Sequence, residues 1–272
     1  MASPEETPLA PGTHFVSDLP ARLDRLPWSP WHVRVVVALG ITWVLDGLEV
    51  TLVGAVGSVL GERESLNLTD SQIGLSASAY LLGAILGSLV FGRLTDALGR
   101  KRLFLVTLGV YVASTALTAT SLNFAMFAFF RAMTGAGIGG EYSAINSAVD
   151  ELLPARIRGR ADLAINSTYW LGTGLGAAST LVLLDTRLMP HSVGWRLCFG
   201  LGALLGSVIL FVRKHLPESP RWLLLHSRVH QAEAVVSGIE RELERELKRP
   251  VPHPGAPSSS WPRRLRARPT SP

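Results

Sequence analysis

Four ionisable side chains lie inside long apolar stretches of the chain. Asp46 and Glu49 fall in the first stretch, and Arg131 and Glu141 fall in a later one. A charge inside a lipid bilayer costs roughly 2.5–3.5 kcal/mol on insertion scales, so charged residues in such stretches are candidates for function. A buried carboxyl group that faces an arginine can hold, release and retake a proton, because burial favours its neutral form and the arginine favours its charged form. These residue types therefore indicate proton exchange within a membrane.

The spacing of three of these residues allows them to meet at one depth. Asp46 and Glu49 are three residues apart, so they share one face of a helix. With a rise of about 1.5 Å per residue, Asp46 and Glu49 lie about 18 and 22 Å along their helix, and Arg131 lies about 20 Å from the same side. The alternative is a static salt bridge that holds two helices together. Glu141 is expected nearer the cytoplasmic side.

Other chemistries fit the sequence less well. Residues 135–140 match the dinucleotide pattern G-x-G-x-x-G, but no strand precedes them and they lie in an apolar stretch. The histidines fall in loops and tails, which disfavours an intramembrane hydrolase. The single cysteine, Cys198, has no partner for a disulfide or a cysteine metal site. We therefore expect no catalytic residue, no cofactor, no metal site and no enzymatic activity.

Aromatic residues near the charged ones are candidates for a solute site that takes a sugar or an aromatic acid. For each ring the alternative is ordinary packing or contact with lipid. The rings in question are Trp43, Tyr80, Tyr169 and Trp170.

The composition excludes a soluble enzyme. Of the 272 residues, 47% are hydrophobic and 17% are charged, with a mean hydropathy of +0.29, whereas a soluble domain carries about 25% charged residues. Apolar runs of about 18 to 22 residues recur, and each can cross a hydrocarbon core of roughly 30 Å. The net charge of +5 comes from basic residues in the flanking loops, so we expect no nucleic-acid partner. Continuous apolar runs predict helices rather than barrel strands.

The fold class predicted is an all-α membrane protein with six transmembrane helices. Basic residues gather before the first crossing and in the loops after the second and fourth, so both termini are expected in the cytoplasm of a multi-pass protein of the cell (inner) membrane. The start of the chain shows no removable signal peptide. Residues 1–30 form a cytoplasmic tail and 31–214 the transmembrane domain. The crossings are expected at 34–59, 73–92, 103–122, 124–147, 163–184 and 196–213.

Small residues and a repeated pattern suggest how these helices pack. Glycines four residues apart let helices approach closely in lipid. Residues 78–87 of the second crossing align with residues 167–176 of the fifth. Three crossings separate these stretches, which predicts an inverted 3+3 repeat; chance similarity between two glycine-rich helices is the alternative. The glycine pairs are Gly83 and Gly87, Gly135 and Gly139, Gly172 and Gly176, and Gly202 and Gly206.

The chain turns polar after the sixth crossing. Residues 215–249 contain apolar side chains at helical spacing, which predicts an amphipathic helical segment on the cytoplasmic surface. From 250 to 272 the composition changes to proline, serine and arginine, which is typical of a disordered tail. The apolar positions are Ala232, Val235, Val236, Ile239, Leu243 and Leu247.

Several motifs resemble those of the major facilitator superfamily. Residues 92–102, GRLTDALGRKR, closely resemble its signature loop G-x-L-x-D-x-x-G-R-K/R. Residues 151–159 and 217–222 are similar to two sugar-porter motifs, and residues 131–140 to the fourth-helix pattern. Residues 46–49, DGLE, resemble an Asp-Gly-aromatic-Asp element of metabolite–proton symporters, with Leu and Glu as departures.

The resemblance implies roles for particular residues. Asp46 would be the proton-coupling acid and Arg131 its partner, with Glu49 and Glu141 beside them. A cytoplasmic gate would be formed by reversible pairs, each contributing about 0–1 kcal/mol as an isolated surface pair. The gate residues are Gly92, Asp96, Gly99, Arg100, Glu151, Arg158, Glu218 and Arg221.

The length matches about half of the machine that the superfamily builds, because such carriers combine two six-helix halves. The expectation is thus the amino-terminal half of a proton-coupled carrier for a sugar or a carboxylate, inactive alone, with a truncated or frameshifted tail. One alternative is a half-transporter that works as a homodimer or with a separate second half. The other is a membrane protein that binds solute or regulates without transport. The expected partners are a small-molecule solute, a proton and the lipid bilayer.

Overall fold

The computed structural model of the chain describes residues 18–213 and 218–251, apart from the side chains of Asp96 and of 211–213. The regular elements in this part of the chain are all helices, in agreement with the all-α prediction. Its helices are α1 (Leu19–Asp24), α2 (Pro30–Leu60), α3 (Asp70–Leu98), α4 (Arg100–Ala119), α5 (Phe124–Leu152), α6 (Arg158–Leu183), α7 (His191–Arg213), α8 (Pro220–Leu225) and α9 (Val229–Leu247).

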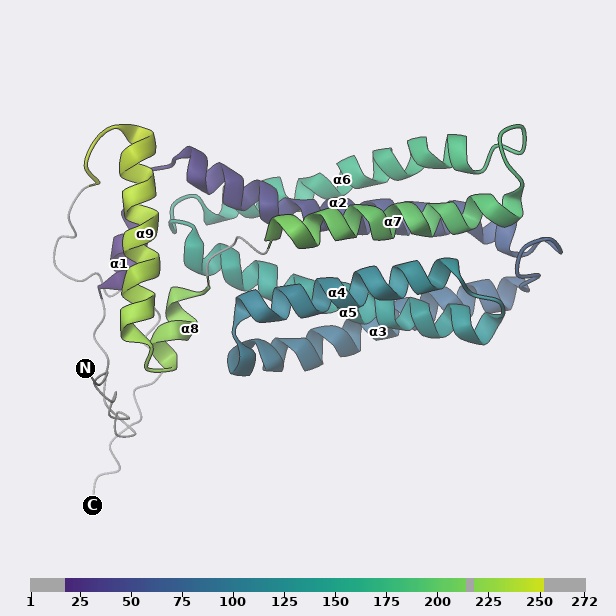
Figure 1. The fold of residues 1–272 in the computed structure, drawn as a ribbon, viewed down its shortest axis with the longest axis horizontal. Helices are drawn as coiled ribbons and strands as arrows, with labels where there is room; N and C mark the ends of the chain where they lie inside the picture. The colour runs from purple at the N-terminus through teal and green to yellow at the C-terminus, as the bar shows by residue number, and fades with distance from the viewer. Residues whose placement is uncertain (1–17, 214–217, 252–272) are drawn as a thin grey trace, which may run out of the picture.

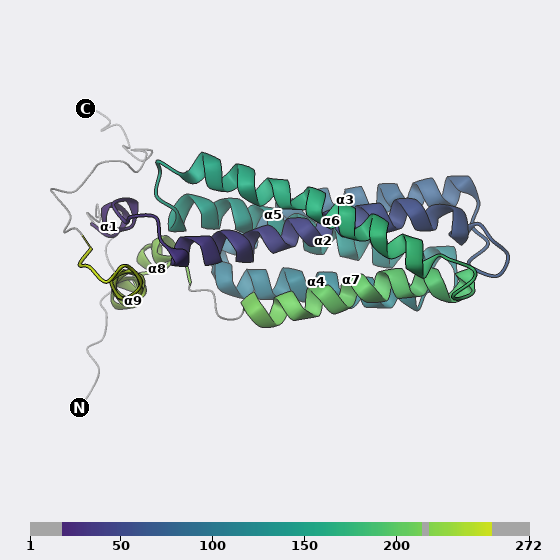
Figure 2. The same cartoon turned by 90° about the horizontal axis from the view of Figure 1, so that it is seen from above.

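Helices α2 to α7 form an elongated bundle in which successive helices run in opposite directions (Figures 1 and 2). They coincide with the six expected crossings to within several residues. The helices α1, α8 and α9 lie at one end of the bundle, which we call the α9 end; the connections 61–69, 120–123 and 184–190 lie at the other, which we call the loop end (Figure 1).

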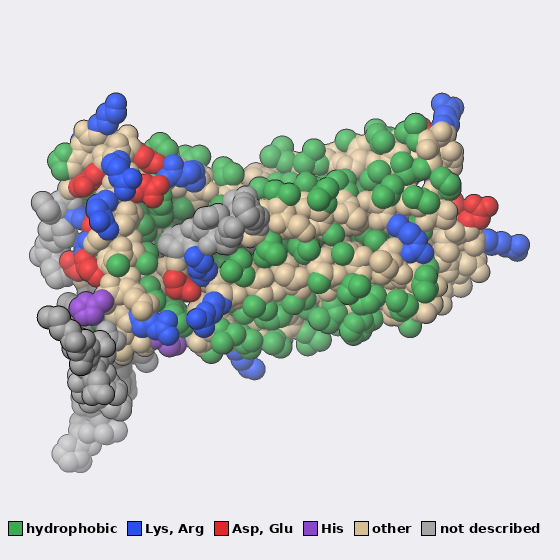
Figure 3. Space-filling model, viewed as in Figure 1, with side chains coloured by type: hydrophobic (Ala, Val, Ile, Leu, Met, Phe, Trp, Pro, Cys, Tyr) green, Lys and Arg blue, Asp and Glu red, His purple; other side chains and the backbone are tan. Residues whose placement is uncertain are grey.

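Four of the long helices, α2, α3, α4 and α7, are long and apolar enough to cross a membrane by length and composition; α5 and α6 are not among them. Hydrophobic side chains cover the middle of the bundle surface, and charged side chains gather towards its two ends (Figure 3). This distribution is typical of a protein that crosses a bilayer with its ends in water.

Local sequence signals explain where several helices begin. Thr69 and Gln72 form a capping box at the start of α3, in which each side chain accepts a hydrogen bond from the backbone N–H of the other residue. Asn123 accepts the backbone N–H of Met126 at the start of α5, at 3.0 Å. Pro30 occupies the first turn of α2, where its missing N–H costs nothing.

Glycines bring two pairs of helices into close contact. A Cβ atom at Gly83 or Gly87 of α3 would collide with the carbonyl oxygen of Ala132 or Ala136 of α5, so these positions require glycine. The predicted close packing is therefore present between α3 and α5 and also between α2 and α6. The other glycines at which a Cβ would collide with the backbone of a facing helix are Gly47 of α2, Gly135, Gly137 and Gly139 of α5, Gly172 and Gly176 of α6, and Gly194 of α7.

The predicted amphipathic helix is α9, which lies across the end of the bundle (Figure 1). Its side chains Ala232, Val236, Ile239 and Leu243 are buried in an apolar core shared with α1, α2, α5 and α8. The apolar face of α9 therefore packs on protein. The short helix α1 was not predicted, and the tail from 252 onward lies outside the described residues.

Ion pairs fasten α1 to α9. The guanidinium of Arg22 pairs with Glu240 at 2.5 Å and with Glu233 at 2.5 Å, and Arg25 pairs with Glu240 at 2.6 Å. Although burial acts to raise it, the two guanidinium groups hold the pKa of Glu240 below its ordinary value of 4.5. The α9 end is thus tied together by charge as well as by its apolar core.

Candidate functional site

A buried ion pair joins α2 to α5 inside the bundle. The carboxylate of Glu49 accepts a charge-assisted hydrogen bond from the guanidinium of Arg131, and each side chain is only 2% exposed. Arg131 also lies over the ring of Tyr80, with its Cζ 4.4 Å from the ring centroid, and 5.8 Å from that of Phe199. Cation–π contacts of this kind strengthen when water is excluded.

Asp46 lies beside this pair and is held by two phenols. The hydroxyl of Tyr80, on α3, donates to Oδ1 of Asp46 at 2.9 Å, and the hydroxyl of Tyr142, on α5, donates to Oδ2. Asp46 is 6% exposed. Hydrogen bonds donated to both oxygens favour the ionised form of a carboxyl group.

The direct partner of Arg131 differs from the one that the family resemblance implied. Asp46, Glu49 and Arg131 do meet at one depth, as the helix-rise calculation required, but the arginine pairs with Glu49 rather than with Asp46. Side chains three residues apart lie only about 60° apart around a helix axis, so spacing along α2 could not decide which of the two acids pairs with Arg131. Asp46 instead accepts hydrogen bonds from Tyr80 and Tyr142.

The ion pair keeps unused hydrogen-bonding capacity. Among the described residues, Oε2 of Glu49 and Nε of Arg131 have no hydrogen-bond partner, and both atoms are buried. Leaving a buried polar atom unpartnered costs about 1–3 kcal/mol. These atoms can therefore accept or donate to a group that enters the site.

Glu141 occupies a separate position further along α5. The hydroxyl of Thr107, on α4, donates to Oε1 at 2.7 Å, and that of Thr42, on α2, donates to Oε2 at 3.4 Å. Glu141 is fully buried. It therefore links three helices through neutral hydroxyl donors.

The aromatic candidates separate into different environments. Trp43 stacks on Tyr142 with ring centroids 4.7 Å apart and an interplanar angle of 17°, and both are half-buried. Tyr80 is buried between Asp46 and Arg131. Trp170 is 72% exposed on the outside of α6, and Tyr169, half-buried, packs edge-on against it with ring centroids 5.7 Å apart. The stack of Trp43 and Tyr142 therefore offers an aromatic surface next to Asp46.

A second charged cluster lies at the α9 end, where α4, α5 and α8 meet. Arg100 pairs with Glu151 at 2.5 Å and donates to the carbonyl oxygen of Ser147 at 2.9 Å. The other oxygen of Glu151 accepts from the hydroxyl of Ser219. Glu151 is 4% exposed, so this pair is well shielded from water.

Glu218 caps the start of α4 across this cluster. Its Oε1 accepts the backbone N–H groups of Arg100 at 2.8 Å and Lys101 at 3.1 Å. The two helices α3 and α4 turn at Gly99, which has a φ of +88° and a ψ of 155°, a conformation that is essentially restricted to glycine. The acid and the turn explain together why these residues stand close to one another.

Not every predicted gate residue joins this cluster. Arg158 donates to the carbonyl oxygen of Leu153 at 2.9 Å, which is a contact within its own chain segment. A Cβ at Gly92 would meet only Ser143 Oγ at an ordinary 3.6 Å, so no close approach requires glycine there. Arg221 contributes electrostatically to Glu151. The side chain of Asp96 lies outside the described residues.

Sequence reasoning missed several partners, among them Tyr142, Thr107 and Ser219. Each is a neutral hydroxyl residue that reaches an acid on another helix. Ser219 lies within the motif at 217–222, but Tyr142 and Thr107 carry no periodic or motif signal, because their contacts depend on how the helices are rotated. Within the described residues, no group of three or more His, Cys, Asp or Glu side chains is arranged to hold a metal ion.

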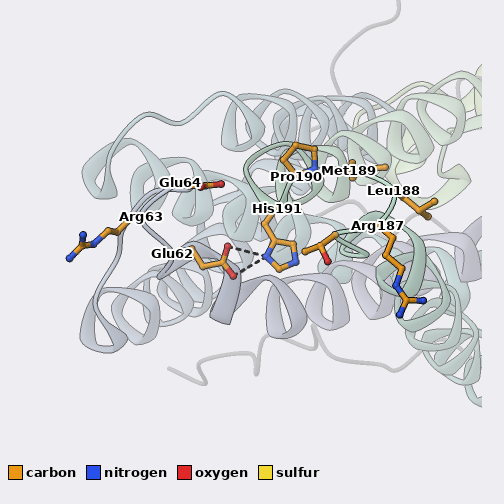
Figure 4. Close-up of a pocket in the computed structure, with 9 residues that line it drawn as sticks. Glu62, Arg63, Glu64, Arg187, Leu188, Met189, Pro190 and His191 are labelled. Atoms are coloured by element: carbon orange, nitrogen blue, oxygen red, sulfur yellow. Dashed lines mark hydrogen bonds and ion pairs between the residues drawn. The ribbon is translucent and has the colours of Figure 1, made fainter.

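A pocket of about 760 Å³ lies at the loop end, away from these residues. His191 and Glu62 point towards each other across it (Figure 4), with Nδ1 of the imidazole 2.8 Å from Oε1 of the carboxylate. Nε2 of His191 faces the carbonyl oxygen of Leu184 at 3.1 Å. None of the residues predicted for a site lines this pocket.

Comparison with known proteins identifies relatives over most of the chain. It is 30% identical over 224 residues to the niacin transporter of Acinetobacter baylyi, covering 82% of this chain and 49% of that protein. It is 33% identical over 216 residues to myo-inositol transporter 2 of Schizosaccharomyces pombe, covering 79% and 38%. An inner membrane metabolite transport protein of Escherichia coli is 30% identical over 222 residues, covering 80% and 47%. The chain thus spans about half the length of these curated relatives.

Solved structures share its fold. The proton:xylose symporter XylE superposes with a TM-score of 0.66 at 19% identity, covering 79% of this chain and 52% of that one. The family model described as "Sugar (and other) transporter" matches residues 48–249. Proteins of this family are transporters rather than enzymes. The chain therefore belongs to the sugar transporter family of the major facilitator superfamily.

Proposed function

We propose that the chain forms one six-helix half of a proton-coupled carrier that moves a small organic solute across the cell membrane. The observation that carries the proposal is the buried acid Asp46, held by two tyrosine hydroxyls beside the Glu49–Arg131 pair. An acid in this position can exchange its hydrogen-bond donors for a proton when the surroundings change. Glu49 and Arg131 provide the fixed charges around it.

An inverted 3+3 repeat is supported by matching glycine contacts. A Cβ at Gly47 of α2 would meet the carbonyl of Tyr169 on α6, and a Cβ at Gly135 of α5 would meet the carbonyl of Tyr80 on α3. Exchanging α2 with α5 and α3 with α6 converts the first contact into the second. The same exchange relates the contact of Gly172 with Val44 to that of Gly83 with Ala132. It also relates the contact of Gly176 with Leu48 to that of Gly87 with Ala136. Such repeats are the building plan of many carriers.

In the proposed orientation the protein spans the inner membrane with both termini on its cytoplasmic side. Basic residues cluster around the α9 end, in the segment before α2 and in the turns α3–α4 and α5–α6. The positive-inside rule assigns that end to the cytoplasm. The name of the Escherichia coli relative, an inner membrane protein, supports the same location.

The solute we propose is a sugar or a carboxylate, including an aromatic acid. Relatives named for niacin and for myo-inositol support a small ring-shaped solute. The stacked rings of Trp43 and Tyr142 give such a ring a flat surface next to Asp46. The unpartnered atoms of Glu49 and Arg131 supply further hydrogen bonds.

The cluster of Arg100, Glu151 and Glu218 is proposed as the gate on the cytoplasmic side. In this arrangement the three residues hold the starts of α4 and α8 and the end of α5 together. A second six-helix half would be required to complete the cavity, because the chain spans about half the length of its relatives. Large exposed side chains on α3 and α6, among them Leu82, Leu86, Leu171 and Leu175, offer apolar surface for it.

The test is the pH dependence of solute binding by the purified chain in lipid nanodiscs, with nicotinate, myo-inositol and D-xylose as probes. We expect at least one probe to bind with a pH-dependent affinity that becomes flat in Asp46→Asn. Asp150→Asn removes an exposed acid of α5 and is expected to behave as the wild type. An unchanged pH profile in both Asp46→Asn and Arg131→Ala would show that these charges are structural.

Measurement of solute uptake distinguishes one six-helix half from a complete carrier. The chain reconstituted alone in proteoliposomes with an inward proton gradient is expected to show no uptake of these probes. Uptake by a species of twice the mass would favour a homodimer instead. Binding without flux, even after a second half is supplied, would favour a solute-binding or regulatory protein.

A further inference from the structure

The two phenols that hold Asp46 are fixed to different degrees. Tyr80 is 7% exposed, and its ring lies under the guanidinium of Arg131. Tyr142 is half-buried, and its ring stacks on the half-buried ring of Trp43. Tyr80 is therefore held by a buried charge, whereas Tyr142 can turn away if another flat group takes its place on Trp43.

Protonation of Asp46 requires one of these two hydrogen bonds to change. Both oxygens of Asp46 accept from a phenol O–H. A proton placed on Oδ2 along this contact displaces the hydrogen that Tyr142 donates, so the phenol must then either rotate its O–H and accept from the acid or move away from Oδ2. Loss of the donor to a carboxylate also makes protonation easier, because the hydrogen bond favours the charged form.

We infer that Tyr142 is a positioning residue that couples contact at the Trp43 ring to the protonation of Asp46. The inference rests on the proposed role of Asp46 in proton coupling. A solute with a flat ring stacks on Trp43 in place of Tyr142, the phenol leaves Oδ2, and Asp46 takes up a proton from water. Solute and proton then enter the site together, which is the requirement for symport.

Other titratable or charged groups also face Asp46, and the experiment must separate Tyr142 from them. Those on the helices packed around it are Glu49 of α2, Tyr80 of α3, Tyr111 of α4 and Arg131 of α5; Tyr169 of α6 faces Tyr142 itself. Among the residues that the structure describes, Tyr142 alone joins Asp46 to an aromatic stack with Trp43.

The experiment is an infrared pH titration of the full chain in nanodiscs. The C=O band of protonated Asp46 is assigned by its loss in Asp46→Asn. We expect Tyr142→Phe, which keeps the ring but removes the hydroxyl, to raise the pH at half-height by about one unit, or about tenfold in proton affinity. Trp43→Leu is expected to raise it as well, because the phenol loses the ring that positions it.

Double variants test whether the Trp43 ring acts on Asp46 through the hydroxyl of Tyr142. If the Trp43 ring acts through the Tyr142 hydroxyl, then Trp43→Leu adds nothing to Tyr142→Phe but adds its full effect to Tyr80→Phe. Trp43→Phe keeps an aromatic face and is expected to titrate as the wild type, which separates the stack from a general loss of packing. The measured quantity is the pH at which Asp46 is half-protonated. A purely structural role for Tyr142 would leave this pH unchanged.

Two results would overturn the inference. The first is a wild-type titration in Trp43→Leu, and the second is full additivity of Trp43→Leu with Tyr142→Phe. If Asp46 gives no titrating band in the wild type, the inference and the proposed function fall together. If the cycle behaves as expected but solute binding exchanges no proton, only the proposed function falls.

Discussion

Alanine in place of Gly99 tests how the turn between α3 and α4 is built. The residue has a φ of +88° and a ψ of 155°, and a side chain in such a conformation costs on the order of 1–3 kcal/mol. The added Cβ would also lie 2.9 Å from Oε2 of Glu218 and 3.4 Å from Cε2 of Trp222. Displacing Glu218 weakens the cap of α4, which is worth about 1 kcal/mol.

The two contributions predict that Gly99→Ala destabilises the chain by about 2–4 kcal/mol. The measurement is unfolding of the purified chain in detergent, followed by far-ultraviolet circular dichroism. The matched control is Gly109→Ala in the interior of α4, where a Cβ would meet nothing within 4 Å and alanine is expected to stabilise the helix by about 0.5–1 kcal/mol.

A third variant separates the backbone from the cap. In a Glu218→Ala background the cap is already lost, so Gly99→Ala should cost less there than in the wild type. The reasoning would be refuted if Gly99→Ala unfolded at the wild-type midpoint or above it. An equal cost in both backgrounds would show that the Glu218 carboxylate plays no part.

Three further predictions concern the core and the α9 end. Glu49→Gln leaves the buried charge of Arg131 unpaired and is expected to lower the free energy of unfolding by about 3–5 kcal/mol. In the same unfolding assay, the double variant of Glu49→Gln with Arg131→Met should recover part of this stability. An undiminished loss of stability in the double variant would argue against a direct pair. Gly139→Ala drives a Cβ into the backbone of Ala84 and should lower the unfolding midpoint, whereas Gly174→Ala, with open space around it, should not. Because the pKa of Glu240 is lowered in the folded chain, its contribution to stability is complete above about pH 4.5 and lost as the pH falls through the folded pKa. The hydrogen-exchange protection factors of α9, corrected for the intrinsic exchange rate at each pH, should therefore fall on acidification, and fall less in Glu240→Gln. An identical acid response in that variant would contradict the assignment.

Periodicity and motifs were enough to predict the frame of the molecule. The spacing of Ala232, Val236, Ile239 and Leu243 predicted the buried face of α9, because burial follows the 3.6-residue repeat. The apolar runs predicted where the long helices lie, although by length and composition four of these helices, α2, α3, α4 and α7, qualify as membrane spans among the described residues. Helix α1 escaped prediction because six residues carry too short a pattern, and its stability comes from packing against α9.

The depth of the site residues in the bundle could be predicted, but which acid pairs with Arg131 could not. Counting the rise along α2 and α5 placed Asp46, Glu49 and Arg131 together, yet the choice of Glu49 as the partner of Arg131 depends on the rotation of α2 about its axis. That rotation is fixed by glycine contacts such as Gly47 on the carbonyl of Tyr169. The hydroxyl of Tyr142 reaches Asp46 for the same reason, and no local pattern announces it.

Proton exchange on solute binding tests the central claim most directly. The purified chain is mixed with nicotinate, myo-inositol or D-xylose in weakly buffered solution that contains a pH-indicator dye, while binding is followed in parallel. The account predicts that a bound probe is accompanied by uptake of protons from solution, and that Asp46→Asn removes this uptake while Asp150→Asn preserves it. Binding of a probe with no proton exchange, or with the same exchange in Asp46→Asn, would contradict the role of Asp46.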